Sequence, residues 1–269
     1  MKINHVFHVS LQVLRRHKLL PLGLFALGAV LFAALLAAEF GGRQPATLAL
    51  DVGLSTLRLV LPLFLVFQVQ ELFSREFDRK FYQLSLSYPV SRLGWFGGRF
   101  LALLAVSLGL LLIIGLALML LVWWVGQDYA QPTPVSLGLP LWITLGFIGL
   151  ELLVLLSLAC LLAVFASTPS FVLIGTLGFM LIARSYAAVI ALLADSSGLV
   201  HDAEGYRSGL GVLGYLLPDL GALDLRMMAL YGQMDFLPGD WPLLVAMALS
   251  YSLALLALSV WQFQRKQFA

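Results

Sequence analysis

Residues 100–125 read FLALLAVSLGLLLIIGLALMLLVWWV, an apolar run without a single charged side chain. A helix that crosses the hydrocarbon core of a bilayer needs about 20 consecutive, mainly apolar residues. The abundance of leucine in the run favours a helix over the alternating pattern of a membrane β-strand. The stretch Phe100–Val125 is therefore predicted to be a membrane-spanning helix.

Five other stretches share this character, which makes six predicted spans. The other five are Leu19–Ala38, Val52–Val69, Leu139–Phe165, Phe171–Leu193 and Trp241–Phe263. Hydrophobic residues make up 61% of the 269-residue chain and charged residues 11%, whereas a soluble domain carries about 25% charged residues. The composition excludes a soluble domain, and the single Cys160 excludes an internal disulfide. The predicted fold class is an all-α polytopic membrane protein with six transmembrane helices, in one domain over residues 1–269.

The basic residues divide unevenly between the two sides of six alternating spans. Eleven of the 16 lysine and arginine residues fall on the side that holds both chain ends: Lys2, Arg15, Arg16, Lys18, Arg75, Arg79, Lys80, Arg92, Arg99, Arg265 and Lys266. Most acidic residues fall on the opposite side. Because lysine and arginine near membrane spans favour the cytoplasmic side, both termini are predicted to be cytoplasmic.

Residues 1–18 are predicted to form an amphipathic helix ahead of the first span. The residues that recur at three- and four-residue spacing on one face of this helix are Ile3, Val6, Phe7, Ser10, Val13 and Leu14. Basic residues follow at 15, 16 and 18, so the helix is expected to lie along the inner leaflet. A plain membrane anchor with no further role is an open alternative. The span behind it exceeds the roughly 7–15 residues of a signal-peptide core and is expected to stay uncleaved.

The largest predicted cytoplasmic segment is residues 71–99, ELFSREFDRKFYQLSLSYPVSRLGWFGGR. Its apolar helical stripe consists of Phe73, Phe77, Phe81 and Leu84, with charged residues on the other faces. Tyr88 is expected to end this helix because proline at 89 disfavours α geometry in the residue before it. Ser91 is expected to cap the next helix. The segment suits a docking surface, and an ordinary amphipathic loop is an open alternative.

Residues 194–240 form a long predicted outer segment that begins polar and then turns apolar. Its apolar part is interrupted by Gly211, Gly214, Pro218 and Gly221, so it is too broken for a full span and too apolar for a free loop. Short re-entrant helices in the outer leaflet, before the last span, satisfy both properties. Non-helical backbone at that depth has to be covered by protein or line a wet cavity.

Several catalytic motifs are missing from the sequence. No lysine follows a glycine, as a Walker phosphate-binding loop requires. Neither His-Glu-x-x-His nor Gly-x-Ser-x-Gly occurs, and one cysteine cannot form a thiolate metal pair. The chain is therefore not expected to be an enzyme, to hold a cofactor or metal of its own, or to bind nucleic acid.

Two charged residues lie deep inside the predicted spans, where a charge costs at least about 2.5 kcal/mol on insertion scales. Glu151 is about 18 Å from the outer start of its span, and Arg184 is about 14 Å from the outer end of the next one. The very short turn between these spans makes them antiparallel neighbours. We expect the two residues to form an ion pair or to face a shared polar pathway. A purely structural bridge, or two unrelated side chains, is the open alternative.

Local motifs in the cytoplasmic and outer segments add to this layout. Glu71 and Glu76 are followed by QLSLSYPVSR at residues 83–92 and by Gly98-Arg99-Phe100. Together with the amphipathic leader and six spans, they resemble the type-2 ATP-binding-cassette exporter permeases, which often have an acidic residue after span two and a leucine-rich run ending in Pro-Val-Ser-Arg. The subgroup that contains the permease for nitrous oxide reductase maturation is similar at residues 216–219 (LLPD), Leu225 and Tyr231-Gly232.

The resemblance implies a half-transporter in the inner (plasma) membrane of a prokaryote. Two copies, as a homodimer, would pair among membrane lipids, and each would bind a separate ABC-type ATPase that holds ATP and Mg²⁺. The residues implied in docking that ATPase are Glu71, Phe73, Arg75, Glu76, Phe77, Arg79, Lys80, Phe81, Tyr88 and Arg92. Closure of the ATPases would move an unidentified substrate outward, with Glu151 and Arg184 on its pathway.

A second class of function stays open, namely a membrane scaffold or assembly factor that recruits partners without transport. The segment 71–92 suits both classes. A scaffold, however, has less need of charged residues inside its spans, such as Glu151 and Arg184. A membrane enzyme is disfavoured by the missing catalytic motifs.

Overall fold

The computed structural model describes residues 3–16, 19–74, 91–127, 135–166, 168–195 and 218–265. Within these ranges every regular element is a helix, and six helices are long and apolar enough to span a membrane. They are α2 (Leu19–Phe40), α3 (Pro45–Val69) with its π-helical continuation η1 (Gln70–Ser74), α6 (Arg92–Val125), α7 (Leu139–Phe165), α8 (Pro169–Asp195) and α11 (Trp241–Arg265). The prediction of an all-helical fold with six such helices is confirmed.

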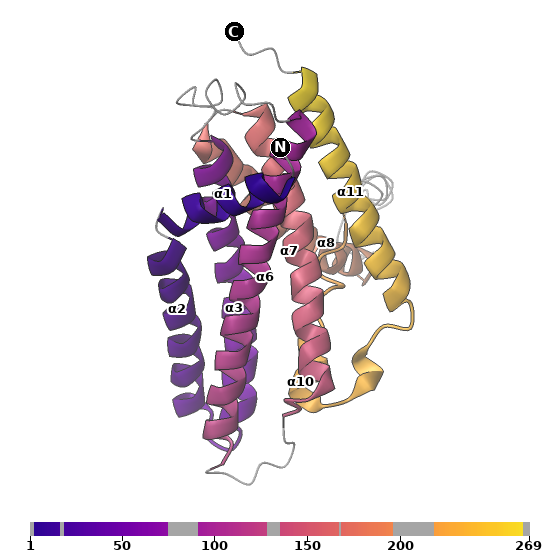
Figure 1. Cartoon of the computed structure of the whole chain (residues 1–269). Helices are drawn as coiled ribbons and strands as arrows, with labels where there is room; N and C mark the ends of the chain where they lie inside the picture. Colours follow the sequence, from indigo (N-terminus) through magenta and orange to yellow (C-terminus); the bar gives the residue numbers. More distant parts are fainter. Residues whose placement is uncertain are drawn as a thin grey trace.

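Helix α7 lies in the middle of the bundle (Figure 1). It packs against α3, α6, α8 and α11, and against the short helix α10 (Arg226–Tyr231). Its sequence is apolar on all sides, as a helix enclosed by other helices requires. Polar side chains of α7 such as Thr144 and Glu151 are therefore buried inside protein and have to find partners there.

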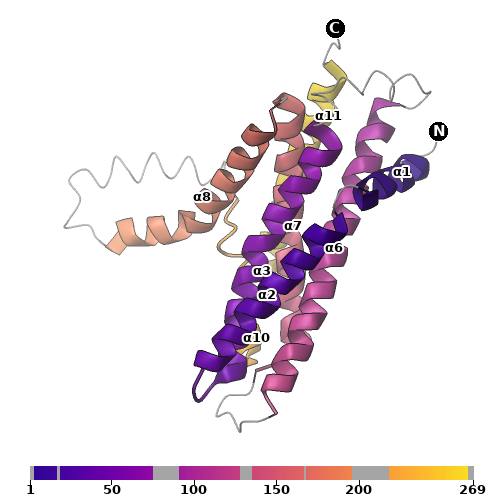
Figure 2. The ribbon, with the colours of Figure 1, turned by 90° about the vertical axis from the view of Figure 1, so that its left-hand side faces the viewer.

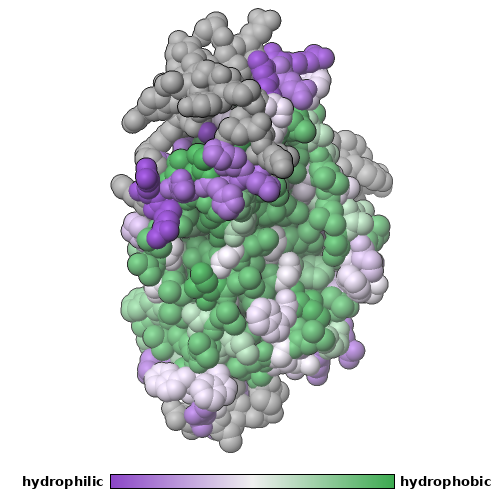
Figure 3. Space-filling view, viewed as in Figure 1, coloured by the Kyte–Doolittle hydropathy of each residue, from purple (hydrophilic) through white to green (hydrophobic). Residues whose placement is uncertain are grey.

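The outer surface of the bundle is apolar along its middle. Figure 3 shows hydrophobic residues over this middle part and hydrophilic residues gathered toward the two ends. Large exposed apolar side chains on the outer helices include Phe25, Phe32, Ile113 and Leu181. An apolar surface of this extent fits contact with lipid tails and not with water.

Helix α1 (Ile3–Arg16) lies across one end of the bundle and packs on α6 (Figure 1). The predicted amphipathic helix is confirmed, and Val6, Ser10 and Leu14 of its apolar face are buried against the protein. Arg15 and Arg16 in its last turn are exposed. The end of α11 lies at the same end of the bundle as α1, as six alternating spans require (Figure 1).

Two helices begin earlier than the apolar runs predict. Helix α3 starts at Pro45 and not at Val52, because proline at the first helical position gives up an N–H that has no partner there. Helix α6 starts at Arg92, where the side chain of Ser91 accepts a hydrogen bond of 3.1 Å from the N–H of Gly94. The predicted cap at Ser91 is confirmed. Hydropathy marks only the apolar part of a helix, so it missed both polar beginnings, of which the cap at Ser91 predicted the second.

The described part of the outer segment is folded into the bundle. Residues 218–225 have irregular backbone, followed by α10 and the single turn η2 (Met234–Phe236). The predicted short helices are present at these two places, whereas residues 196–217 lie outside the described residues. Figure 2 shows α8 leaning away from the bundle, with residues 218–225 running between it and α3. We call residues 218–225 the wedge.

Candidate functional site

Glu151 lies at the centre of the protein and binds two arginines. The Nε of Arg184 on α8 donates to Oε1 of Glu151 at 2.6 Å, so the predicted contact between these two residues is confirmed. The Nε of Arg58 on α3 donates to the other carboxylate oxygen at 3.0 Å. The side chain of Glu151 is 2% exposed and that of Arg58 is 7% exposed. One buried carboxylate thus holds α3, α7 and α8 together.

Arg58 is the partner that sequence reasoning missed. The span predicted from hydropathy starts at Val52, and such a span would put Arg58 near its outer end. The helix starts at Pro45, so Arg58 is 13 residues along it, or about 20 Å deep. The expectation of only two charges deep inside the spans is therefore wrong, since Arg58 is a third.

The ionic contacts continue from Arg58 toward the end of the bundle where α3 begins. Arg58 pairs with Asp224 of the wedge. Asp224 also accepts from Nε of Arg226 at 2.9 Å, and Nη1 of Arg226 lies 3.1 Å from Oδ1 of Asp51 on α3. Cations and anions thus alternate through six residues, which we call the charge network: Arg184, Glu151, Arg58, Asp224, Arg226 and Asp51.

The charge network is neutral and runs from the interior to the surface. Its three arginines match its three carboxylates, which is the condition under which buried charges are tolerated. The exposed fraction of the side chain rises from 2% at Glu151 to 24% at Asp224 and 41% at Asp51. The inner ion pairs therefore contribute most of the electrostatic stabilisation, because solvent screens the outer pairs.

A proline explains one further bond of Arg184. Pro62 lies inside α3 and has no N–H, so the carbonyl oxygen of Arg58, four residues earlier, lacks its usual helical donor. The Nη2 of Arg184 donates to this carbonyl at 2.8 Å. Arg184 thereby satisfies both a side chain of α7 and the backbone of α3, and so fixes α8 against both helices.

The wedge is tied to three helices around the charge network. The N–H of Leu220 donates to the carbonyl of Ala183 on α8 at 3.2 Å, and Arg58 reaches the carbonyl of Leu220 at 3.4 Å. The hydroxyl of Thr144 on α7 lies 3.0 Å from the carbonyl oxygen of Leu225. These partners satisfy backbone groups that would otherwise be costly to bury.

Gly221 is the point where the wedge comes closest to α8. A Cβ at this position would lie 2.8 Å from the carbonyl oxygen of Arg184, which is backbone and cannot move aside cheaply. We expect Gly221→Ala to lower the free energy of unfolding by about 1–3 kcal/mol through overpacking. The measurement is unfolding of the purified chain in detergent micelles. Gly178→Ala on α8 is the matched control, because open space surrounds that position; equal losses in the two variants would contradict the close fit at Gly221.

A second cluster lies at the opposite end of α3. We call Phe73, Trp95, Phe96 and Phe263 the aromatic cluster. The rings of Trp95 and Phe263 stack with centroids 5.1 Å apart, and Phe73 meets Trp95 edge to face at 5.8 Å. The four rings come from η1, α6 and α11, so the cluster joins the ends of three spans.

Polar contacts reinforce the aromatic cluster. The guanidinium of Arg99 lies 3.8 Å from the centroid of the Trp95 ring and donates to the carbonyl of Leu72. Nη1 of Arg92 donates to the carbonyl of Gln264 at 2.7 Å. Gln70 donates to the carbonyl of Pro169 at 2.8 Å, which adds the start of α8. Phe73 and Arg92, which lie in the described residues on either side of positions 75–90, thus belong to one packed region.

The residues predicted to dock a partner divide into two groups. Glu71 in η1, Phe73 and Arg92 belong to the described residues. The ring of Phe73, the first member of the predicted apolar stripe, is fully buried in the aromatic cluster. The other seven lie outside the described residues: Arg75, Glu76, Phe77, Arg79, Lys80, Phe81 and Tyr88. Within the described ranges no three histidine, cysteine or acidic side chains gather as metal ligands.

The sequence was also compared with known proteins. No curated protein matches the chain. A family model described as a protein of unknown function, DUF2705, matches residues 26–269. The matched range contains every residue of the charge network and of the aromatic cluster. Because the match covers most of its length, the chain belongs to the DUF2705 family.

Proposed function

We propose that the chain is the transmembrane permease subunit of an ATP-driven exporter of the type-2 ATP-binding-cassette kind. The observation that carries the proposal is that the residues flanking positions 75–90 in sequence, Phe73 and Trp95, pack together in the aromatic cluster, where η1, α6 and α11 meet. A partner that pulls on this segment would move three spans together. The sequence run 83–92, QLSLSYPVSR, supports the same assignment through its resemblance to such permeases.

In the proposed transporter a separate ATPase supplies the energy. It would hold ATP and Mg²⁺ and bind the coupling segment, residues 71–99, from the cytoplasm. When the ATPase closes, the tight packing around Trp95 and Arg99 would make the spans move with the coupling segment as one rigid unit. The permease chain itself would bind no nucleotide.

The charge network would limit the movement of α8. Pulling Arg184 away from Glu151 leaves its guanidinium without a carboxylate, while Glu151 keeps Arg58, and this makes intermediate positions costly. A bundle of this kind favours a few discrete arrangements over continuous drift. Glu151 and Arg184 would thus join α7 to the moving helix α8, on the pathway along which substrate moves outward.

The proposal includes an orientation and an assembly. Both termini would be cytoplasmic, in the inner membrane of a prokaryote, because basic residues dominate the side that holds them. The exposed arginines of α1, Arg15 and Arg16, would contact lipid phosphates of the inner leaflet. The wedge would then be re-entrant from the outer side. Two copies would form the transporter as a homodimer.

Charge reversal in the coupling segment tests the proposal. The full chain carrying a purification tag is expected to retain an ATPase with a Walker loop when isolated at low expression from its own organism. Arg79→Glu with Lys80→Glu is expected to reduce the retained ATPase at least tenfold, because the docking surface changes sign. Arg15→Glu with Arg16→Glu on α1 is the matched control and should retain it. Absence of any ATPase, or full retention by the Arg79 and Lys80 variant, would contradict the proposal.

A further inference from the structure

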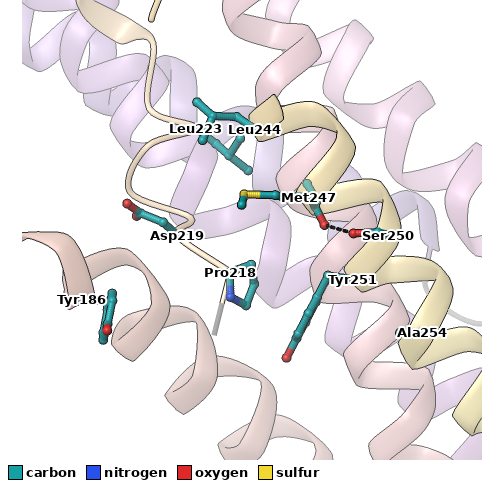
Figure 4. Close-up of a pocket in the computed structure, with 10 residues that line it drawn as sticks. Tyr186, Pro218, Asp219, Leu223, Leu244, Met247, Ser250, Tyr251 and Ala254 are labelled. Atoms are coloured by element: carbon teal, nitrogen blue, oxygen red, sulfur yellow. Dashed lines mark hydrogen bonds between the residues drawn. The ribbon is translucent and has the colours of Figure 1, made fainter. Parts of the chain in front are cut away.

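A cavity of about 520 Å³ lies between α8, the wedge and α11 (Figure 4). Figure 4 shows Met247 and Tyr251 of α11 on one side, with Tyr186 of α8 and Asp219 of the wedge on the other. Leucines 223 and 244 close one end. The size falls in the range of about 300–1,000 Å³ that holds small organic molecules.

The wedge separates this cavity from the charge network. Leu220 is bonded to Ala183 in the middle of α8 and to Arg58 of the network, while its neighbour Asp219 lines the cavity. A molecule in the cavity would therefore contact the wedge, which the ion pair between Arg58 and Asp224 holds in place. Apart from Asp219, Ser250 and the two tyrosines, the side chains that line the cavity are apolar.

Asp219 is the unusual member of the lining. Its Oδ1 accepts a hydrogen bond of 3.1 Å from the N–H of Ala222. In the part of the chain that the structure describes, no basic side chain pairs with it, whereas Glu151 and Asp224 nearby are each bound by two arginines. A partly buried carboxylate without a counter-charge, in a mostly apolar lining, is costly, and a cationic ligand would offset that cost.

We propose that this cavity binds a hydrophobic organic cation. The positive group would lie near the carboxylate of Asp219 and against the aromatic rings of Tyr186 and Tyr251, which attract cations through their faces. The apolar body would contact Met247 and Leu244. Identification of such cations as the exported substrates rests on the proposed function, but binding to the cavity does not.

Two ions of the same shape and opposite charge test the charge preference. Tetraphenylphosphonium and tetraphenylborate are compared by equilibrium dialysis against the full chain in detergent micelles, with binding to empty micelles subtracted. Asp219→Asn is expected to weaken tetraphenylphosphonium binding about tenfold and to leave tetraphenylborate binding unchanged or tighter. Met247→Trp, which fills the cavity, is expected to remove tetraphenylphosphonium binding.

Two matched variants control for general damage. Asp235→Asn in η2 and Met227→Trp on α10 alter exposed residues outside the lining and are expected to bind tetraphenylphosphonium like the wild type. The proposal is overturned if wild type does not bind the cation, if Asp219→Asn binds it unchanged, or if both ions respond alike to both variants. The last result would indicate an uncharged pocket for lipid chains. Because no ATPase takes part, failure of the export proposal leaves this result untouched.

Discussion

Glu151→Gln is expected to lower the free energy of unfolding by about 3–5 kcal/mol. The substitution keeps the shape of the side chain but removes the carboxylate shared by Arg58 and Arg184. Arg58 keeps Asp224 as a partner, whereas Arg184 loses its ionic contact within the described residues and keeps the carbonyl of Arg58. The cost of a buried, uncompensated guanidinium therefore dominates the loss.

A double-mutant cycle isolates the ion pair from this loss. Glu151→Gln, Arg184→Gln and the double variant are compared by denaturant unfolding in micelles. The double variant is expected to lose less than the sum of the single losses, because it no longer leaves the guanidinium of Arg184 without its carboxylate. Glu39→Gln is the matched control, since Glu39 is exposed near the end of α2, and should change stability by less than about 0.5 kcal/mol. Strictly additive losses would contradict the pairing.

Trp95→Ala is the second substitution with a large expected effect, a loss of about 3–5 kcal/mol. Trp95 is 3% exposed, stacks on Phe263, meets Phe73 edge to face and carries the guanidinium of Arg99. Truncation opens a cavity at the point where α6, α11 and η1 meet. In the proposed transporter the same change is expected to weaken the coupling of ATP hydrolysis to movement of the spans.

Position matters more than residue type for this effect. Trp124 near the other end of α6 is 63% exposed, so Trp124→Ala is expected to cost far less than Trp95→Ala. Trp95→Phe keeps an aromatic ring against Phe263 and is expected to recover part of the stability. Thermal unfolding of the three variants in the same detergent provides the comparison. Equal losses of stability in Trp95→Ala and Trp124→Ala would show that the aromatic cluster does not stabilise the junction of η1, α6 and α11.

Hydropathy predicted the spans well because a bilayer demands long apolar helices. The range Leu139–Phe165 coincides with α7, since the whole helix is apolar. The start of α3 was missed because Pro45 to Asp51 mixes apolar and polar residues outside the densest apolar run. That error of seven residues also hid the depth of Arg58.

The charge network could be predicted only in part. Glu151 and Arg184 stand out in a sequence because they interrupt apolar runs on neighbouring helices. Asp224 pairs with Arg58 from a distant part of the chain, and no local spacing reveals such a contact. Pro62 carries a usable signal, since it frees the carbonyl of residue 58, but only the fold shows that Arg184 supplies the donor.

The burial of Phe73 shows a different limit. Its spacing with Phe77 and Phe81 fits an exposed amphipathic stripe, and the same spacing fits a ring packed inside the bundle. Periodicity reports which residues share a face but not what covers that face. Trp95 and Phe96, on the next described helix, are the rings that contact Phe73.

In the proposed transporter, ATP hydrolysis by a partner drives the movement of the spans of this chain. The direct measurement is the ATPase rate of the co-purified complex in lipid nanodiscs, compared with the rate of the isolated ATPase and of a complex that carries Trp95→Ala. We expect a higher ATPase rate in the wild-type complex than in the isolated ATPase. The complex that carries Trp95→Ala is expected to stimulate the ATPase less. A stable complex whose rate equals that of the isolated ATPase, with or without Trp95→Ala, would contradict the claim and identify the chain as a scaffold that recruits its partner without transport.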